Sequence, residues 1–595
     1  MSVARYDEPV RFPLLLLLML ATLGACPPPA KPCDSTNCVG CCDASGQCQP
    51  GSGATSCGSA GAQCSACSGG NTCQLNVCLP SGGMGGGTGG GAVGGGGGTV
   101  QTGTFTVSGH VTYDFVRATY DVPTDMGTLD FANATQRPVR NGVARVVEGT
   151  TVLATTNTAA DGAYSLTFTA TGAGPLSVQV LAKTSRPAVT VQDNTSANAV
   201  WAMGAAVPTG GGTLDLRATH GWTGMAFDPL QRKAGPFAIL DSMYTAASAF
   251  LTARPTLQLP LLKVNWSPNN TTDSNGTIEQ GFIGTSYFDA SVNEIYVVGK
   301  DGVDLDEFDN HVIVHEWGHY FESNVSRSDS LGGDHTSGDV LDPRDAFSEG
   351  WGNAASGMLL NDPVYVDTYF TGTRIDAFGW DLENEPTPTD DTSPGPFSET
   401  SVMRFIYDAW DTTNEAGFDG VATGLGPIAD AFTTGHRTND ALTTIASLVT
   451  ALKAQPGVTA ASVDTLLAHW NIGPLTSAFG DGDATLRAMF ENVTTLPRNQ
   501  SVMLDGRVGF NFAAQNRYWV LTGNGARITV TGNSVEDVSI GAYRRGFEVG
   551  FADNGTTGPE TFSFNSTAGT LYVITLTGYG ALNGSYSATM AITSP

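Results

Sequence analysis

The stretch Val314-His315-Glu316-Trp317-Gly318-His319-Tyr320 lies in the middle of a chain of 595 residues. Successive residues of an α-helix turn by about 100°, so residues four positions apart project from one face. His315 and His319 have this spacing, and two imidazoles so placed can hold one metal ion. The stretch therefore predicts a helix that presents half of a metal site.

Glu316 follows the first histidine and is expected to lie beside the metal ion rather than on it. Its carboxylate could take a proton from a metal-bound water. Upstream, Asp304 and Glu307 have the spacing of a helix N-cap and its reciprocal partner. We therefore expect the helix to begin near Asp304 and to carry the histidine pair into a core.

A third protein ligand must come from elsewhere. The pattern H-E-x-x-H-x-x-G-x-x-H would require glycine and histidine where the chain has Glu322 and Val325, so this pattern is excluded. Glu349 is the candidate that we select. It lies in a second predicted helix, with Asp342 as the N-cap and Pro343 in the first turn.

These residues together resemble the gluzincins, the thermolysin and fungalysin type of peptidase. The likeness is carried by His315, Glu316 and His319 and by the following Glu349-Gly350-Trp351. It implies an α+β zincin-like domain in which His315, His319 and Glu349 hold one catalytic Zn²⁺ ion. It also implies that Glu316 is the general base of peptide hydrolysis.

Two further features are compared with the same family. Its members commonly carry an aspartate four residues after the glutamate, which orients a histidine ligand; here Asn353 can still accept from an imidazole N–H, without the charge. Gluzincins also place a Tyr or His donor near the oxyanion that forms during hydrolysis. Tyr407, His436 and His335 are the candidates, in that order.

A strand is predicted at 294–298, just before the metal helix. In gluzincins the edge strand of the sheet at this point pairs with an extended substrate. An internal strand without substrate contact fits the sequence equally well.

Five aspartates between the two predicted metal helices could hold Ca²⁺, because oxygen-rich loops do so. They lack the fixed spacing of an EF-hand, so we prefer a hydrated acidic loop. The five are Asp329, Asp334, Asp339, Asp342 and Asp345.

The overall charge limits the partners. The chain has 56 acidic and 28 basic side chains, and its formal net charge is −28. Nucleic acid and anionic membrane surfaces would repel such a protein. We therefore expect a protein or peptide substrate, no nucleic acid, and a monomer.

The N-terminus indicates export. Arg5 and Arg11 precede an apolar run, 13–23, which is shorter than the roughly 20 residues that span a bilayer but suits a signal peptide. Leu23-Gly24-Ala25-Cys26 resembles a bacterial lipobox, in which the cysteine is lipidated. An ordinary cleaved signal is the alternative. We expect a protein anchored at the cell envelope or surface through Cys26, or released from it.

All 11 cysteines lie between residues 26 and 78. If Cys26 carries lipid, the other ten can pair fully, and an oxidising compartment favours five disulfides. The alternative is zinc bound by Cys38-x-x-Cys41 and Cys64-x-x-Cys67, which have ligand spacing. Export favours disulfides over zinc.

Composition and hydrophobic periodicity predict a multidomain chain. Alternating apolar residues and turn pairs such as Asn141-Gly142 indicate β-structure on both sides of an α+β region. The expected parts are a signal peptide (1–25), a Cys-rich disulfide module (26–80), a Gly-rich linker (81–100), a β-sandwich (101–207), a zinc metallopeptidase domain (208–498) and a C-terminal β-sandwich (499–595).

Each predicted sandwich resembles a known accessory domain. The first resembles the carboxypeptidase-regulatory, transthyretin-like repeat through residues 138–143 and 158–166. The second resembles the bacterial pre-peptidase C-terminal domain through Thr561-Phe562-Ser563-Phe564 and Gly584-Ser585-Tyr586.

The sequence thus favours a zinc-dependent endopeptidase of extracellular proteins. Two alternatives stay open. One is a surface adhesion or structural lipoprotein whose metal only braces the middle domain. The other is a metallohydrolase of non-peptide substrates, because a fold does not determine its substrate.

Overall fold

The computed structural model describes residues 100–595 except 385–390, 414–416, 556 and 581–583, and short pieces of the segment 41–80. The pieces are 41–43, 45, 47–49, 52–53, 56–57, 64, 71–74 and 77–80. The expected signal peptide, Cys26 and residues 81–99 of the linker lie outside the described residues. Within that described part, no helix is both long and apolar enough to cross a membrane.

The Cys-rich segment contains a disulfide between Cys41 and Cys64, whose Cα atoms are 4.9 Å apart. Cys42 and Cys48 are also disulfide-bonded. The expectation of disulfides is confirmed for these cysteines, and Cys41 and Cys64 are not available as zinc ligands. The short strands here are β1 (Cys41–Cys42), β2 (Cys48–Gln49), β3 (Ser52–Gly53), β4 (Ser56–Cys57), β5 (Asn71–Gln74) and β6 (Val77–Pro80).

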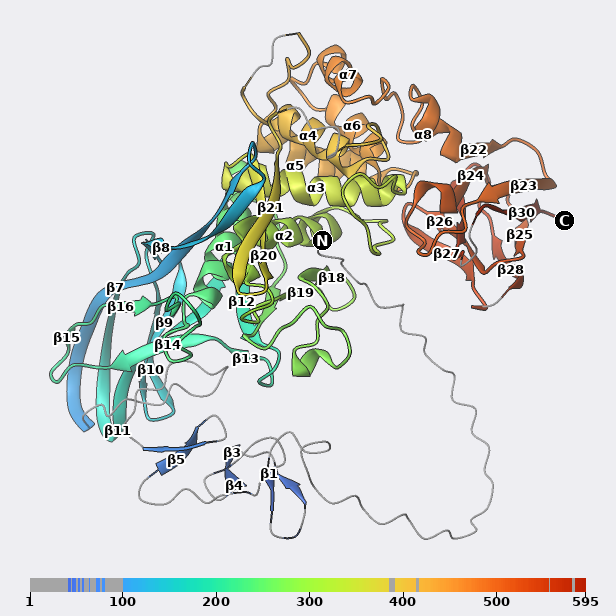
Figure 1. Ribbon diagram of the computed structural model, residues 1–595. Helices are drawn as coiled ribbons and strands as arrows, with labels where there is room; N and C mark the ends of the chain where they lie inside the picture. Colours follow the sequence, from blue (N-terminus) through green and yellow to red (C-terminus); the bar gives the residue numbers. More distant parts are fainter. Residues whose placement is uncertain are drawn as a thin grey trace, which may run out of the picture.

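The region that follows is built from long antiparallel strands (Figure 1). The predicted turns are present: Asn141 (φ 56°) precedes β9, and Gly162 (φ 83°) precedes β11, both in the left-handed conformation that turn residues favour. The strands are β7 (Val100–Asp121), β8 (Met126–Pro138), β9 (Gly142–Glu148), β10 (Thr151–Asn157), β11 (Ala163–Ser185), β12 (Ala188–Asp193), β13 (Ala199–Val200), β14 (Ala202–Ala206), β15 (Gly212–Thr213) and β16 (Leu216–Ala218).

The sheet continues across residue 207 into the middle of the chain. Strand β12 pairs in parallel with β17 (Leu262–Trp266), which pairs in parallel with β19 (Glu294–Val297). The last strand of the path, β18 (Tyr287–Asp289), pairs antiparallel with β19. The 294–298 strand is therefore internal, and among the described strands β18 occupies the edge.

Helices cover this part of the sheet and continue beyond it (Figure 1). Apolar residues of the sheet and the helices form one continuous core, in which Trp266, Trp317 and Trp351 are fully buried. The helices are α1 (Gly235–Ala253), α2 (Asn310–Val325), α3 (Pro343–Leu360), α4 (Glu399–Trp410), α5 (Leu425–Ala431), α6 (Ile445–Lys453), α7 (Ala460–His469) and α8 (Ala484–Met489), with 3-10 turns η1 (Ile278–Gln280) and η2 (Asp306–Phe308) and a π-helical turn η3 (Phe432–His436).

The start of α2 differs from the prediction. The helix begins at Asn310, and Asp304 and Glu307 do not cap it. Glu307 is instead buried, where it accepts hydrogen bonds from Arg232 (2.5 Å) and from the Trp266 indole (3.2 Å). Glu307, which the sequence pattern assigned to a capping pair, is therefore bound to the buried Arg232 instead.

The start of α3 is as predicted. Asp342 is the N-cap, its side chain accepts from the N–H of Arg344 (3.0 Å), and Pro343 lies in the first turn. A hairpin follows, made of β20 (Val364–Thr371) and β21 (Arg374–Asp381). It packs against the β7–β8 hairpin of the N-terminal sheet, beside which it is drawn in Figure 1.

The C-terminal region has two sheets around a core of its own. The sheet orders are β22-β24-β29-β26-β27 and β23-β30-β25-β28. The strands are β22 (Phe490–Val493), β23 (Arg498–Leu504), β24 (Asn516–Thr522), β25 (Arg527–Ser534), β26 (Val538–Arg544), β27 (Phe547–Ala552), β28 (Gly558–Asn565), β29 (Leu571–Gly578) and β30 (Tyr586–Thr593), with a 3-10 turn η4 (Ala513–Gln515). The chain is thus multidomain and rich in β-structure, with its helices gathered in the middle.

Candidate metal centre

Helices α2 and α3 approach each other closely because small residues face each other between them. A Cβ atom on Gly318 would lie 3.1 Å from the Cα of Gly352. A Cβ on Gly352 would lie 2.8–2.9 Å from three atoms of the His315 ring. Trp351 donates its indole N–H to the Gly318 carbonyl (2.9 Å). The residues next to Glu349 in α3 therefore pack against α2 and position the helix that carries the two histidines.

The three side chains selected from the sequence converge on one point. The Nε2 atoms of His315 and His319 are 3.0 Å apart. Glu349 Oε2 lies 3.3 Å from His315 Nε2 and 3.5 Å from His319 Nε2. We refer to His315, His319 and Glu349 as the histidine site.

These distances fit zinc. Ligand atoms about 2.0–2.1 Å from a tetrahedral zinc ion lie roughly 3.3 Å from one another. The three separations in the histidine site, 3.0, 3.3 and 3.5 Å, bracket that value. Two imidazoles and one carboxylate are also a donor set that zinc accepts, and three ligands leave one position open.

Each histidine is held from behind. The Nδ1–H of His315 donates to the side-chain oxygen of Asn353 (2.8 Å), as the comparison with the aspartate of relatives predicted. The Nδ1–H of His319 donates to the Ser348 hydroxyl (3.2 Å), which donates to Glu322 (2.7 Å). Such partners fix the tautomer, so that Nε2 of each ring faces the metal.

Glu316 lies on the same turn and lines the adjoining cavity. It is 7% exposed, and burial, with a smaller contribution from the charge of Glu349, raises its pKa to about 8. A cation held by the histidine site would favour its ionised form. Glu349 is already ionised: burial opposes its charge, but the His319 and His335 charges hold its pKa well below the usual range.

The candidate oxyanion donors lie in different places. His335 lines the cavity, with Nε2 3.7 Å from Glu349 and 3.3 Å from Glu399. Burial opposes the charge of His335, but the two carboxylates outweigh it and raise its pKa well above the usual range. Tyr407 packs against Trp410, and His436 contacts Ser447 (3.0 Å) in the core; neither lines the cavity.

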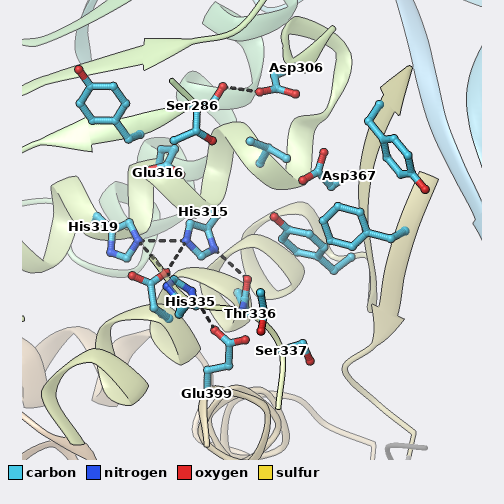
Figure 2. A pocket seen from close by; sticks show the side chains of 18 of the residues that line it. Ser286, Asp306, His315, Glu316, His319, His335, Thr336, Ser337, Asp367 and Glu399 are labelled. Carbon is cyan, nitrogen blue, oxygen red and sulfur yellow. Dashed lines mark hydrogen bonds and ion pairs between the residues drawn. The ribbon is translucent and has the colours of Figure 1, made fainter. Parts of the chain in front are cut away.

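The cavity has a volume of about 600 Å³. In Figure 2, His315, His319, His335 and Glu399 occupy one side, and Asp306 and Asp367 lie across from them. Part of the wall comes from the β20–β21 hairpin, through Tyr365, Asp367, Tyr369, Phe378 and Trp380. Sequence reasoning missed this wall, although the alternating aromatic residues of 365–380 are a strand signal.

The loop that carries His335 is held by the C-terminal region. Tyr518 donates to Asp342 and accepts from Arg344 (2.8 Å), and all three side chains are buried. The backbone N–H of Asp342 donates to the Asn511 carbonyl (2.7 Å), and the Asn511 side chain donates to the carbonyl of Asp334 (3.2 Å). Asn511 thus holds both Asp334, which precedes His335, and Asp342, the N-cap of α3.

The five aspartates from Asp329 to Asp345, the last of which lies in the first turn of α3, do not gather into a calcium site. None of them belongs to a group of convergent acidic or histidine ligands in the described part of the chain. Four of them form local hydrogen bonds or ion pairs instead. The partners are Arg327 for Asp329, Thr336 for Asp339, Arg344 for Asp342, and Ser330, Leu331 and Gly332 for Asp345.

Residues 246–467 match the family model of the mycolysin C-terminal domain. This segment includes the histidine site, Glu316 and His335, and it is thus related to a peptidase domain. No curated protein matches the chain.

Three solved structures are similar over a small part of the chain. The pre-peptidase C-terminal domain of a collagenase from Bacillus anthracis is 10% identical, covers 18% of this chain and 94% of its own, and has a TM-score of 0.14. CorA, a surface-associated copper-binding protein of Methylomicrobium album BG8, is 8% identical, with 18% and 98% covered and a TM-score of 0.13. A CBM36-1 domain of a xylanase from a Trinervitermes trinervoides hindgut metagenome is 15% identical, with 16% and 98% covered and a TM-score of 0.12. TM-scores this low carry no argument about fold or function.

Proposed function

We propose that the protein is a zinc-dependent endopeptidase of the gluzincin type. His315, His319 and Glu349 hold one zinc ion, and Glu316 is the general base. The observation that carries the proposal is the convergence of the three ligand atoms, 3.0–3.5 Å apart, with Glu316 beside them in the wall of a cavity. The match to a peptidase-related domain over the same residues supports it.

When bound, the zinc ion supplies Lewis acidity, which makes water acidic enough to lose a proton near neutral pH. Glu316 accepts that proton and later returns it to the leaving amine. Asn353 and Ser348 keep the two imidazoles oriented throughout. His335 is the donor that we assign to the developing oxyanion, because it alone of the three candidates lines the cavity.

The number of ligands favours catalysis over a bracing role. Structural zinc sites are closed by four protein ligands, whereas the histidine site provides three within mutual reach. A purely structural metal would also have no need of a buried glutamate beside it. The peptidase-related segment favours protein and peptide substrates over non-peptide ones.

We also propose export and a lipid anchor on Cys26. The Cys41–Cys64 disulfide supports an oxidising compartment. Mass spectrometry of the mature N-terminus tests the anchor: an acylated cysteine at position 26 is expected, and an unmodified N-terminus elsewhere would overturn it.

The test of the enzyme uses the full chain. We expect one zinc ion per chain by metal analysis, and cleavage of casein that stops with 1,10-phenanthroline and returns with added zinc. Glu316→Gln should keep the zinc and lose roughly 100- to 10,000-fold in turnover, because the general base is removed.

Glu279→Gln is the matched control, because Glu279 is exposed and does not line the cavity. It should retain full activity. Turnover preserved in Glu316→Gln would overturn the mechanism, and a chain that binds no zinc would overturn the proposal as a whole.

A further inference from the structure

Four aspartates converge on a second point in the same region. Asp304, Asp306, Asp309 and Asp367 each offer a carboxylate oxygen, and these oxygens all lie within 4.8 Å of one another. Asp306 is the first residue of η2, Asp304 precedes this turn and Asp309 follows it directly before α2, and Asp367 comes from β20. We call these four residues the carboxylate cluster.

The cluster is buried and incompletely bonded. Asp306 accepts from Ser286 and Asp309 accepts from the N–H (2.9 Å) and hydroxyl (2.7 Å) of Thr368, in each case through Oδ2. The other oxygen of each, Oδ1, is shielded from solvent and has no hydrogen-bond partner. Asp306 is 5% exposed and Asp309 0% exposed. Buried carboxylate oxygens without a partner are costly, so they indicate a missing ligand.

The charge of the cluster is not balanced by a cation among the described residues. Within the described residues, no lysine or arginine forms an ion pair with any member of the cluster. The neighbouring Arg232 is bound to Glu307 (2.5 Å). Burial, and after it the repulsion between the carboxylates, raises the pKa of Asp304, Asp309 and Asp367 well above the usual range.

We propose that the carboxylate cluster binds one Ca²⁺ ion. An all-oxygen set of carboxylates suits a hard cation, whereas zinc prefers nitrogen and sulfur. Mg²⁺ usually keeps several waters and binds only one or two carboxylates, whereas Ca²⁺ takes six to eight oxygen ligands and suits a set of four carboxylates. The four oxygens all lie within 4.8 Å of one another, so a single ion can contact all of them.

The ion would join two elements that shape the cavity. Asp309 is the residue before α2, and its contact with Thr368 already ties it to β20. Asp367 belongs to the hairpin that forms the aromatic wall. Calcium would therefore fasten this wall to the helix that carries the histidine site. The inference does not depend on the peptidase proposal, because ion binding is measured directly.

A cationic group of a substrate, such as a lysine ammonium, is a different occupant. Asp304, Asp306 and Asp367 line the cavity, so an ammonium could approach them. Asp309 does not line the cavity and is fully buried, and a single positive charge would leave most of the cluster unbalanced. A small divalent ion accounts for all four residues.

The test is a terbium titration of the full, zinc-loaded chain, since Tb³⁺ replaces Ca²⁺ and is sensitised by nearby aromatic rings such as Trp380. We expect luminescence that saturates at one ion per chain and is displaced by Ca²⁺ but not by zinc. Asp306→Asn and Asp367→Asn should each weaken binding by roughly 10-fold or more, because each removes a charged ligand.

Asp301→Asn is the control, because Asp301 lies on the same loop but is exposed; it should bind as the unaltered chain does. Asp367 is only half-buried, so its variant should fold even if Asp306→Asn does not. The absence of saturable binding in the unaltered chain would overturn the proposal. So would equal binding by folded Asp367→Asn and Asp301→Asn. If no ion binds and Asp367→Asn impairs cleavage only of Lys- and Arg-containing peptides, the cluster recognises a substrate cation and the proposal is wrong.

Discussion

The histidine site and the carboxylate cluster lie along the same cavity and differ in how their ligands are prepared. In the histidine site, each imidazole is oriented from behind by Asn353 or Ser348. In the carboxylate cluster, Asp306 and Asp309 are held through one oxygen and leave the other free. The first arrangement suits an ion with strict tetrahedral geometry, and the second suits one that tolerates variable coordination.

The comparison also indicates that the two groups have different roles, one catalytic and one structural. Both groups are at least partly buried. The glutamate beside the histidine site, Glu316, lines the cavity, whereas the glutamate beside the carboxylate cluster, Glu307, is bound to Arg232. The carboxylate cluster joins a hairpin to a helix. If this division is right, damage to one group should leave the ion of the other in place.

The largest effect is expected from His319→Ala. The variant should lose its zinc and roughly 1,000-fold or more of its peptidase activity, because the metal contributes several kcal/mol to the transition state. Its Tb³⁺ titration should be unchanged. Metal analysis and the two assays on one preparation check this. Loss of Tb³⁺ binding in a folded variant would show that the two groups act as one site.

Gly352→Ala should have a smaller effect on the histidine site alone. The new Cβ would press on the His315 ring at 2.8–2.9 Å, so the ring must shift. Zinc affinity should fall by roughly 10- to 100-fold, as for other losses of ligand orientation. Competition with a chromogenic chelator measures it. Gly420→Ala is the control, because nothing lies within 4 Å of its Cβ position; equal affinities in the two variants would contradict the prediction.

Asn353→Asp should have the smallest effect, in the opposite direction. A carboxylate behind His315 would raise the basicity of the imidazole and tighten zinc binding by up to roughly 10-fold. Asn353 is 3% exposed, so the added charge should destabilise the metal-free protein. Thermal melts with and without zinc measure both effects. Asn361→Asp, at the exposed C-terminal end of α3, should leave the zinc affinity unchanged, and unchanged zinc affinity in Asn353→Asp would count against the predicted effect of the carboxylate.

The local parts of the histidine site were predictable from the sequence. The spacing of His315 and His319 and the cap of α3 at Asp342 depend on neighbours within a few residues, and helix geometry does the rest. The contact of Asn353 with His315 was expected from the resemblance to the gluzincins, in which the residue four positions after the glutamate orients a histidine ligand.

Interactions between distant segments were not predictable. Arg232 captures Glu307, so the predicted cap at Asp304 is wrong and α2 begins at Asn310. The carboxylate cluster needs Asp367, which only the folding of β20 onto the start of α2 brings to the other three aspartates. Of the three oxyanion candidates only His335 lines the cavity, because the depth of Tyr407 and His436 in the core depends on tertiary packing. The predicted domain boundary at residue 207 does not interrupt the sheet, because β12 pairs with β17 across it. A change in composition along the sequence therefore did not indicate where strand pairing ends.

The contact between Tyr518 and the start of α3 limits how the chain can be divided. A fragment that ends before residue 499 would contain the histidine site and Glu316 but would lack Tyr518 and Asn511. Asp342 and Arg344 would then be uncovered, and the loop with His335 would lose its anchor at Asp334. The C-terminal region is therefore better regarded as part of the architecture of the cavity than as an exchangeable module. Its removal, by maturation or in the laboratory, would yield an altered catalyst rather than a shorter version of the same one.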